Sequence, residues 1–155
     1  MSSSLTNAVA AIIGIAAVIV ASIMYWRAGA VWRAWRAYLI GNPAKAEDIL
    51  QTVRSPERLG GRKRAYYEWL VGEAVLRHGD PATARVHLHA AASGRLRSNR
   101  DRSFALARLA EAAVTDGDVA AARDAVAQAR SLRPPPFVQV LLADVEAACD
   151  RSPGS

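Results

Sequence analysis

The chain has 155 residues, of which 52% are apolar, 22% charged and 6% aromatic, with a net charge of +6 and one cysteine. This length allows one small domain, and the Ala-rich composition excludes a disordered chain and favours helices over a β-sandwich. A single cysteine excludes an intrachain disulfide framework and a cysteine-based zinc site. The charge is uneven, because residues 1–26 carry none while residues 27–102 hold 15 Lys and Arg against 7 Asp and Glu.

The first predicted element is a transmembrane helix, since residues 5–26 form a run of 22 residues without a charge. As a helix this run would measure about 33 Å, enough to cross a bilayer. The alternatives are a cleaved signal peptide, with a small-residue site at Ala28, Gly29 and Ala30, and a buried core helix. No Lys or Arg precedes the run, and it is long for a signal peptide. We therefore expect residues 1–26 to form a tail and a retained anchor.

Basic residues follow the predicted span and none precedes it, which indicates its orientation. Arg27, Arg33, Arg36 and Lys45 lie within about 20 residues of its end. We expect the C-terminal part of the chain to face the cytoplasm at the inner (plasma) membrane. The following aromatic residues suit a belt at the lipid headgroups: Tyr25, Trp26, Trp32, Trp35 and Tyr38.

An internal repeat begins after the span. Three equally spaced turns carry it: Gly41 and Asn42, Gly79 and Asp80, and Gly117 and Asp118. At the same spacing Ala46, Ala84 and Ala122 align, followed by apolar residues four and seven positions later. Each turn is predicted to separate a first helix, clearest at residues 64–78 and 103–115, from a second helix with one buried face. We expect the glycines to end the first helices, and Asp80 and Asp118 to cap the second helices.

The inward side of the two clearest first helices is predicted from their apolar residues. These are Tyr67, Leu70, Val71 and Val75 in one helix, and Leu106, Leu109, Ala110 and Ala113 in the other. After three prolines, residues 137–149 repeat the helical pattern and are predicted to close the end of the stack. Cys149 is expected to be buried, and residues 150–155 are expected to form a disordered tail.

The repeat resembles the tetratricopeptide repeat (TPR). The third unit, LARLAEAAVTDGDVAAARDAVAQARSLRP at residues 106–134, matches best. The second unit keeps an apolar residue followed by glycine at Val71 and Gly72, whereas the first places Arg33 where the family has an apolar residue. The resemblance implies that residues 27–149 form a TPR-like solenoid of about three helical pairs with a C-terminal capping helix. Together with the predicted transmembrane helix before it, the chain is expected to be all-α. Another helical-hairpin solenoid is the alternative.

Signatures of catalysis are absent from the sequence. His87 and His89 stand two residues apart on a predicted helix and so point to different faces, which excludes a shared metal. No nucleotide-binding loop, nucleophile elbow or zinc motif occurs. We expect no enzymatic activity, no catalytic residues, no cofactor and no metal.

Basic residues gather before the second and third helical pairs. When the repeats are superposed Arg62 aligns with Arg100 and Arg64 with Arg102, which predicts a basic rim along one edge of the stack. Solvated loops are the plain interpretation of these residues. An anionic lipid surface leads the functional interpretations, followed by an acidic protein partner; RNA is disfavoured because few aromatic residues accompany the basic ones.

The predicted function is that of an adaptor or assembly factor, similar to the anchored TPR proteins that organise bacterial envelope biogenesis complexes. The resemblance implies an inner groove that takes a helix or an extended peptide of a partner. Its lining would include Tyr66, Glu73, Arg77, Arg108 and Glu111. A tail-binding chaperone clamp is disfavoured, because Trp69 and Glu73 stand where that clamp needs Lys and Asn. The alternatives are a structural subunit of a membrane complex or an oligomer, and an exported chaperone-like domain.

Overall fold

The computed structural model describes residues 13–19 and 29–151. These residues form helices and turns, and no strand occurs in the described ranges. The predicted all-α class is confirmed. The helices of the domain are residues 29–39, α2 (Pro43–Gln51), the 3-10 helix η1 (Pro56–Arg58), α3 (Gly61–Arg77), α4 (Pro81–Ser93), α5 (Asn99–Thr115), α6 (Val119–Ser131) and α7 (Pro136–Arg151).

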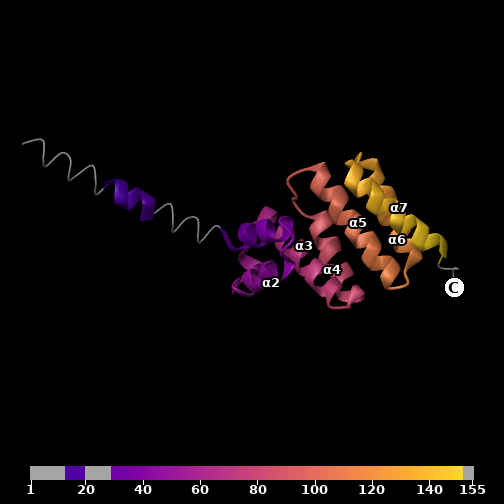
Figure 1. The fold of residues 1–155 in the computed structure, drawn as a ribbon, viewed down its shortest axis with the longest axis horizontal. Coiled ribbons are helices and arrows are strands. Elements are labelled where there is room, and N and C mark those ends of the chain that lie inside the picture. The colour runs from indigo at the N-terminus through magenta and orange to yellow at the C-terminus, as the bar shows by residue number, and fades with distance from the viewer. Residues whose placement is uncertain (1–12, 20–28, 152–155) are drawn as a thin grey trace, which may run out of the picture.

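The helices from α3 onward form a row of antiparallel pairs (Figure 1). α3 packs on α4 and α5 packs on α6, and the two pairs are joined because α4 and α3 both contact α5. α7 packs on α5 and α6 at the C-terminal end of the row. First helices therefore lie beside first helices, which places residues 29–39, α3, α5 and α7 on one side of the molecule.

The predicted repeat is present in the helix lengths and in the turns. α3 and α5 each have 17 residues, α4 and α6 each have 13 residues, and both pairs of helices recur at the spacing of the turns. The three turn glycines have positive φ angles of 78°, 83° and 84°, a conformation that glycine adopts without steric cost. Asp80 and Asp118 accept the backbone N–H of Thr83 and Ala121 at 3.0 Å and so cap α4 and α6. The predicted turn chemistry is therefore confirmed.

The buried face of α3 is wider than predicted. Leu70 is buried as expected, but Tyr66 and Trp69 are 1% and 0% exposed, while Tyr67 and Val71 are only partly buried. The reason is that α3 is covered from several directions, by residues 29–39, α4 and α5. In α5 the predicted inward residues Leu106, Ala110 and Ala113 are all buried, and Leu109 is partly buried.

The structure differs from the sequence-based expectation at the C-terminal end, and it describes only part of the predicted span at the N-terminal end. No helix among the described residues is long and apolar enough to cross a membrane. Of the predicted span only residues 13–19 are described, and the rest lies outside the described ranges. Within it the side chains of Ile13, Ile15, Val18 and Ile19 are 51–66% exposed. At the other end α7 continues to Arg151, so Asp150 and Arg151 belong to the helix and not to a tail. Cys149 is buried as predicted.

Close packing between α3 and α4 depends on the absence of a side chain at Gly72. A Cβ atom added there would lie 2.7 Å from Cγ of Leu88, which is fully buried. We expect Gly72→Ala to lower the free energy of unfolding by about 1–3 kcal/mol, because Leu88 must shift in a filled core. Denaturation by urea, followed by circular dichroism, measures the change.

Gly29→Ala is the matched control, since a Cβ at this helical glycine would meet nothing closer than 3.7 Å. It should leave stability unchanged or raise it by about 0.5–1 kcal/mol through the usual preference of helices for alanine. Equal effects of the two substitutions would contradict the close approach of α3 and α4.

Candidate functional site

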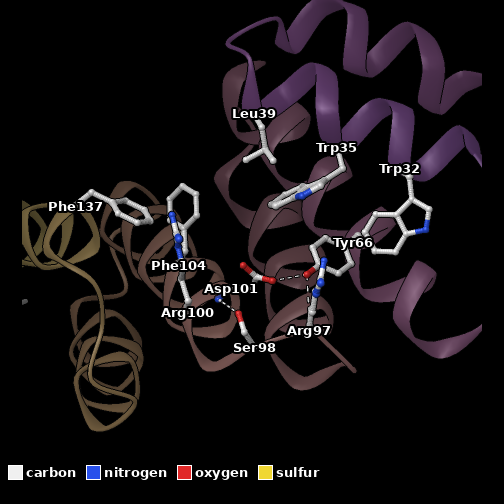
Figure 2. A pocket seen from close by; sticks show the side chains of 10 residues that line it. All are labelled: Trp32, Trp35, Leu39, Tyr66, Arg97, Ser98, Arg100, Asp101, Phe104 and Phe137. Atoms are coloured by element: carbon white, nitrogen blue, oxygen red, sulfur yellow. Dashed lines mark hydrogen bonds between the residues drawn. The ribbon is translucent and has the colours of Figure 1, made fainter.

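A hollow of about 760 Å³ opens on the side formed by the first helices (Figure 2). We call it the aromatic groove. Its apolar lining residues are Trp32, Trp35, Leu39, Tyr66, Phe104 and Phe137, and its polar lining residues are Arg97, Ser98, Arg100 and Asp101. Every first helix contributes to it, from residues 29–39 through α3 and α5 to α7.

The repeat and the helical period position the apolar lining. Trp32, Trp35 and Leu39 recur at i, i+3 and i+7, which places them on one face of the helix formed by residues 29–39. Tyr66 and Phe104 occupy equivalent positions of α3 and α5 in the repeat. Adjacent first helices therefore present their rings to the same side.

Aromatic rings form an unbroken row across the domain. Trp35 lies 4.8 Å from Tyr66 and 4.7 Å from Trp69 between ring centroids, and the row continues from Trp69 to Phe104 at 5.2 Å. Phe104 then meets Phe137 of α7 edge-on at 5.4 Å. These separations are in the favourable range for aromatic pairs. The floor of the groove is consequently held in place by packing of the rings.

Two residues of the lining expose apolar surface. Leu39 is 61% exposed and Phe137 is 46% exposed, whereas Tyr66 in the same lining is 1% exposed. Contiguous exposed apolar surface in a concave site is typical of a binding surface.

The one carboxylate in the lining is already engaged. The hydroxyl of Tyr66 donates to Asp101, and the backbone N–H of Arg97 donates to the same hydroxyl at 3.4 Å. Burial, followed by the hydrogen bond to Asp101, raises the pKa of Tyr66 to about 12. The hydroxyl therefore stays protonated at neutral pH and remains the donor to Asp101.

Two cations of the lining have no acidic partner among the described residues. Arg97 and Arg100 are exposed, and neither forms an ion pair within the described part of the chain. The guanidinium carbon of Arg100 lies 5.3 Å from the ring centroid of Phe137, a cation–π contact. In Figure 2 Arg100 lies beside Phe104 and Phe137, across the groove from Trp35.

Three of the predicted groove residues bind one another. Glu73 is 7% exposed and accepts two hydrogen bonds from Arg108 at 2.7 Å, while Arg108 also pairs with Glu111. Nε1 of Trp69 donates to Glu73 at 3.2 Å. Burial alone would lower the pKa of Arg108, but the hydrogen bonds and the charge of Glu73 outweigh it and raise that pKa. These residues form a clamp between α3 and α5, and we refer to Glu73, Arg108 and Glu111 as the polar clamp.

The other two predicted groove residues lie apart. Arg77 pairs with Glu47 of α2, so it connects the first two helical pairs. Tyr66 does line the aromatic groove, although its ring is almost completely covered.

The predicted basic rim is only partly available for binding. Arg62 and Arg64 lie in the first turn of α3, and Arg100 and Arg102 lie in the first turn of α5. Arg64 pairs with Glu68, and Arg102 donates to the carbonyl of Gly94 at 3.1 Å. Arg62 borders a second hollow of about 470 Å³, lined by Trp32, Gly60, Gly61, Arg62, Lys63 and Arg95.

Histidines and acidic residues do not assemble a metal site in the described ranges, where no group of three or more His, Cys, Asp or Glu residues has the needed geometry. His87 lies 2.6 Å from Glu68 and His78 lies 3.3 Å from Glu47. Both histidines thus make contacts that join neighbouring helices.

The tryptophans of the groove were assigned to a headgroup belt by sequence reasoning. In the structure Trp32 and Trp35 pack on Tyr66, and Trp35 also packs on Trp69, so both belong to the helical domain. The signal that could have located them is their spacing with Leu39, which is that of a helix face packed on a neighbour.

Comparisons of the chain with protein-family models, with curated proteins and with solved structures found no match.

Glu73→Gln tests the polar clamp. The change removes the charge that compensates Arg108, and we expect the free energy of unfolding to fall by about 2–4 kcal/mol, because breaking a buried pair leaves the other charge uncompensated. Glu111→Gln is the control, since the side chain of Glu111 is 38% exposed and its pair with Arg108 should contribute about 0–1 kcal/mol. Urea denaturation of both variants measures the difference, and equal losses would contradict a clamp centred on Glu73.

Proposed function

We propose that this protein is a membrane-anchored, TPR-like adaptor or assembly factor that binds a helix or an extended segment of a protein partner in its aromatic groove, at the cytoplasmic face of the membrane. The observation that carries the proposal is the groove itself. It combines a row of packed rings with exposed apolar surface at Leu39 and Phe137.

The TPR-like assignment is supported by the repeating pairs of helices. A helix of 17 residues followed by one of 13 residues occurs twice, each time with a glycine turn of positive φ between the two helices. Stacked units of this kind bury a continuous core and leave one side of first helices for binding. The small residues at the helix crossings, such as Gly72 against Leu88, are explained by packing.

The anchor is supported by the sequence and by one structural feature. The uncharged run precedes a basic flank, and the apolar side chains of residues 13–19 are exposed. An apolar helix that leaves its side chains uncovered needs another apolar surface, and lipid is the one that the length and lack of charge favour.

Partner capture tests the adaptor function. In the variant Leu39→Ser/Phe137→Ser the groove loses its two most exposed apolar residues, which should abolish co-purification of the partner in mild detergent. Val86→Ser is the control, because Val86 is 68% exposed on α4 and does not line the groove. An unchanged set of co-purified proteins in the groove variant would contradict the proposal and favour a structural subunit held by its span.

The basic rim is proposed to contact anionic lipid. Arg62 and Arg100 are the rim residues whose side chains bind neither an acid nor a carbonyl in the described chain, and Lys63 and Arg95 border the same hollow as Arg62. Cations close to an anionic surface each contribute about 1 kcal/mol at low salt. The rim would thus hold this edge of the domain toward the membrane.

Vesicle sedimentation tests the rim with a chain that begins at residue 27. The variant Arg62→Gln/Lys63→Gln/Arg95→Gln spares Arg100 and should lose roughly 3 kcal/mol of attraction to phosphatidylglycerol vesicles at low salt. The variant Arg123→Gln/Arg130→Gln/Arg133→Gln removes the same charge near the other end of the domain and should sediment normally. Equal binding to neutral vesicles would overturn the rim proposal, provided that circular dichroism shows the chain to be helical.

A further inference from the structure

We infer that the partner segment in the aromatic groove is acidic as well as apolar: its large apolar side chains cover the aromatic floor while its Asp or Glu side chains pair with Arg97 and Arg100. This inference rests on the proposed docking function of the groove and adds the chemistry of the occupant. The inference follows from the position of Arg97 and Arg100, whose positive charges have no acidic partner in the described chain.

Positive charge exceeds negative charge in the lining of the groove, which holds two arginines and one carboxylate. Asp101 is the only carboxylate in the lining, and it accepts the hydroxyl of Tyr66. Arg97 and Arg100 carry the opposite charge without an ion pair in the described residues. The second hollow shares Trp32 with the groove and adds three cations and no acid to this region, namely Arg62, Lys63 and Arg95. A basic segment would be repelled here, and an acidic one attracted.

Several arginines elsewhere in the described chain are paired. Arg85 binds Asp116 and Asp118 at 2.5 and 2.6 Å, and Arg130 binds Glu146 at 2.6 Å. Arg108 is held by Glu73. A carboxylate that approached these arginines would have to displace an internal partner. At Arg97 and Arg100 a carboxylate displaces only water, and it does so beside exposed aromatic surface, which favours the groove for a segment that is both acidic and apolar.

Arg100 places a positive charge directly beside the apolar surface of the groove. Its guanidinium lies over Phe137, a ring that is 46% exposed, so the cation lies directly on the apolar surface that the occupant would cover. Guanidinium groups present several N–H donors in a plane and bind carboxylates through two of them. An apolar side chain on Phe104 and Phe137 and a neighbouring carboxylate on Arg100 can therefore be bound together by one short segment.

The open form of the groove favours a polypeptide over a lipid tail. Leu39 and Phe137 in its lining are 61% and 46% exposed, and the lining comes from all four first helices. An acyl chain lying in such an open channel would keep much of its surface in water. A peptide places separate apolar side chains on the rings and leaves its polar backbone and its acidic side chains outward, where Arg97 and Arg100 lie.

Three synthetic peptides of equal length test the inference on the full chain in detergent micelles. They carry the same Leu and Phe residues and differ only at the remaining positions, which are Glu, Gln or Lys. Fluorescence anisotropy of the labelled peptides gives their affinities. We expect the Glu peptide to bind about tenfold more tightly than the Gln peptide at low salt, with the difference reduced at high salt, and the Lys peptide to bind most weakly.

Matched variants test whether the preference for the Glu peptide comes from Arg97 and Arg100. Arg97→Gln/Arg100→Gln should bring the ratio of the affinities for the Glu and Gln peptides to about one, because the two cations that favour the Glu peptide are gone. Arg54→Gln/Arg58→Gln removes the same charge from two residues that do not line the groove, and it should keep the advantage. If both pairs of substitutions act equally, the preference comes from overall charge and the assignment to Arg97 and Arg100 is overturned.

The outcomes separate this inference from the docking function on which it rests. Equal affinities for the Glu and Gln peptides, both lost in Leu39→Ser/Phe137→Ser, would overturn acid recognition and leave docking in place. Binding of none of the peptides would also overturn the inference, while partner capture would still decide the docking function. Binding of short-chain phosphatidylglycerol that depends on Phe137, without binding of the Glu peptide, would assign the groove to a lipid.

Discussion

The bidentate ion pair between Glu73 and Arg108 fixes the spacing of α3 and α5, and the aromatic groove depends on that spacing. Glu73 is buried and also accepts Nε1 of Trp69, whose ring lies between Trp35 and Phe104. The hydrogen bond from Trp69 to Glu73 thereby sets the position of the Trp69 ring, which joins the two halves of the aromatic row. Buried pairs contribute little net stability when compared with apolar packing, but they do define which groups must meet.

The charged side chains discussed above fall into two groups that differ in their contacts. Acidic residues near the turns and in the clamp neutralise arginines that join one helix to the next, as in Arg85 with Asp116 and Asp118. At the groove, by contrast, Arg97 and Arg100 lack such partners in the described chain. Internal pairing thus connects the helices of the stack, while the unpaired cations would attract the acidic segment that we propose as the occupant of the groove.

The turns could be predicted from the sequence because their chemistry is local. A glycine followed by aspartate specifies a positive φ and a helix cap within a few residues, and both appear at Gly79 and Asp80. The lining of the groove could be predicted only in part: Tyr66 lines it as expected, but the other lining residues depend on how each helix is rotated against its neighbours. Glu73 shows this most clearly: its sequence position fits an exposed groove residue, and only the proximity of Arg108 explains its burial.

The link between α4 and α5 differs from the glycine turns because two of its residues line the groove. Residues 94–98 carry Arg97 and Ser98 into the groove, whereas the helices on either side form the core with residues such as Leu88 and Leu106. Gly94, Leu96 and Ser98 of this link pack on the core or cap α5, but the side chain of Arg97 is exposed and forms no ion pair in the described chain, so its substitution can change the charge of the groove while the stack keeps its contacts. Related chains could for this reason diverge in their partners while keeping one scaffold, with the change concentrated in a few residues of a single loop.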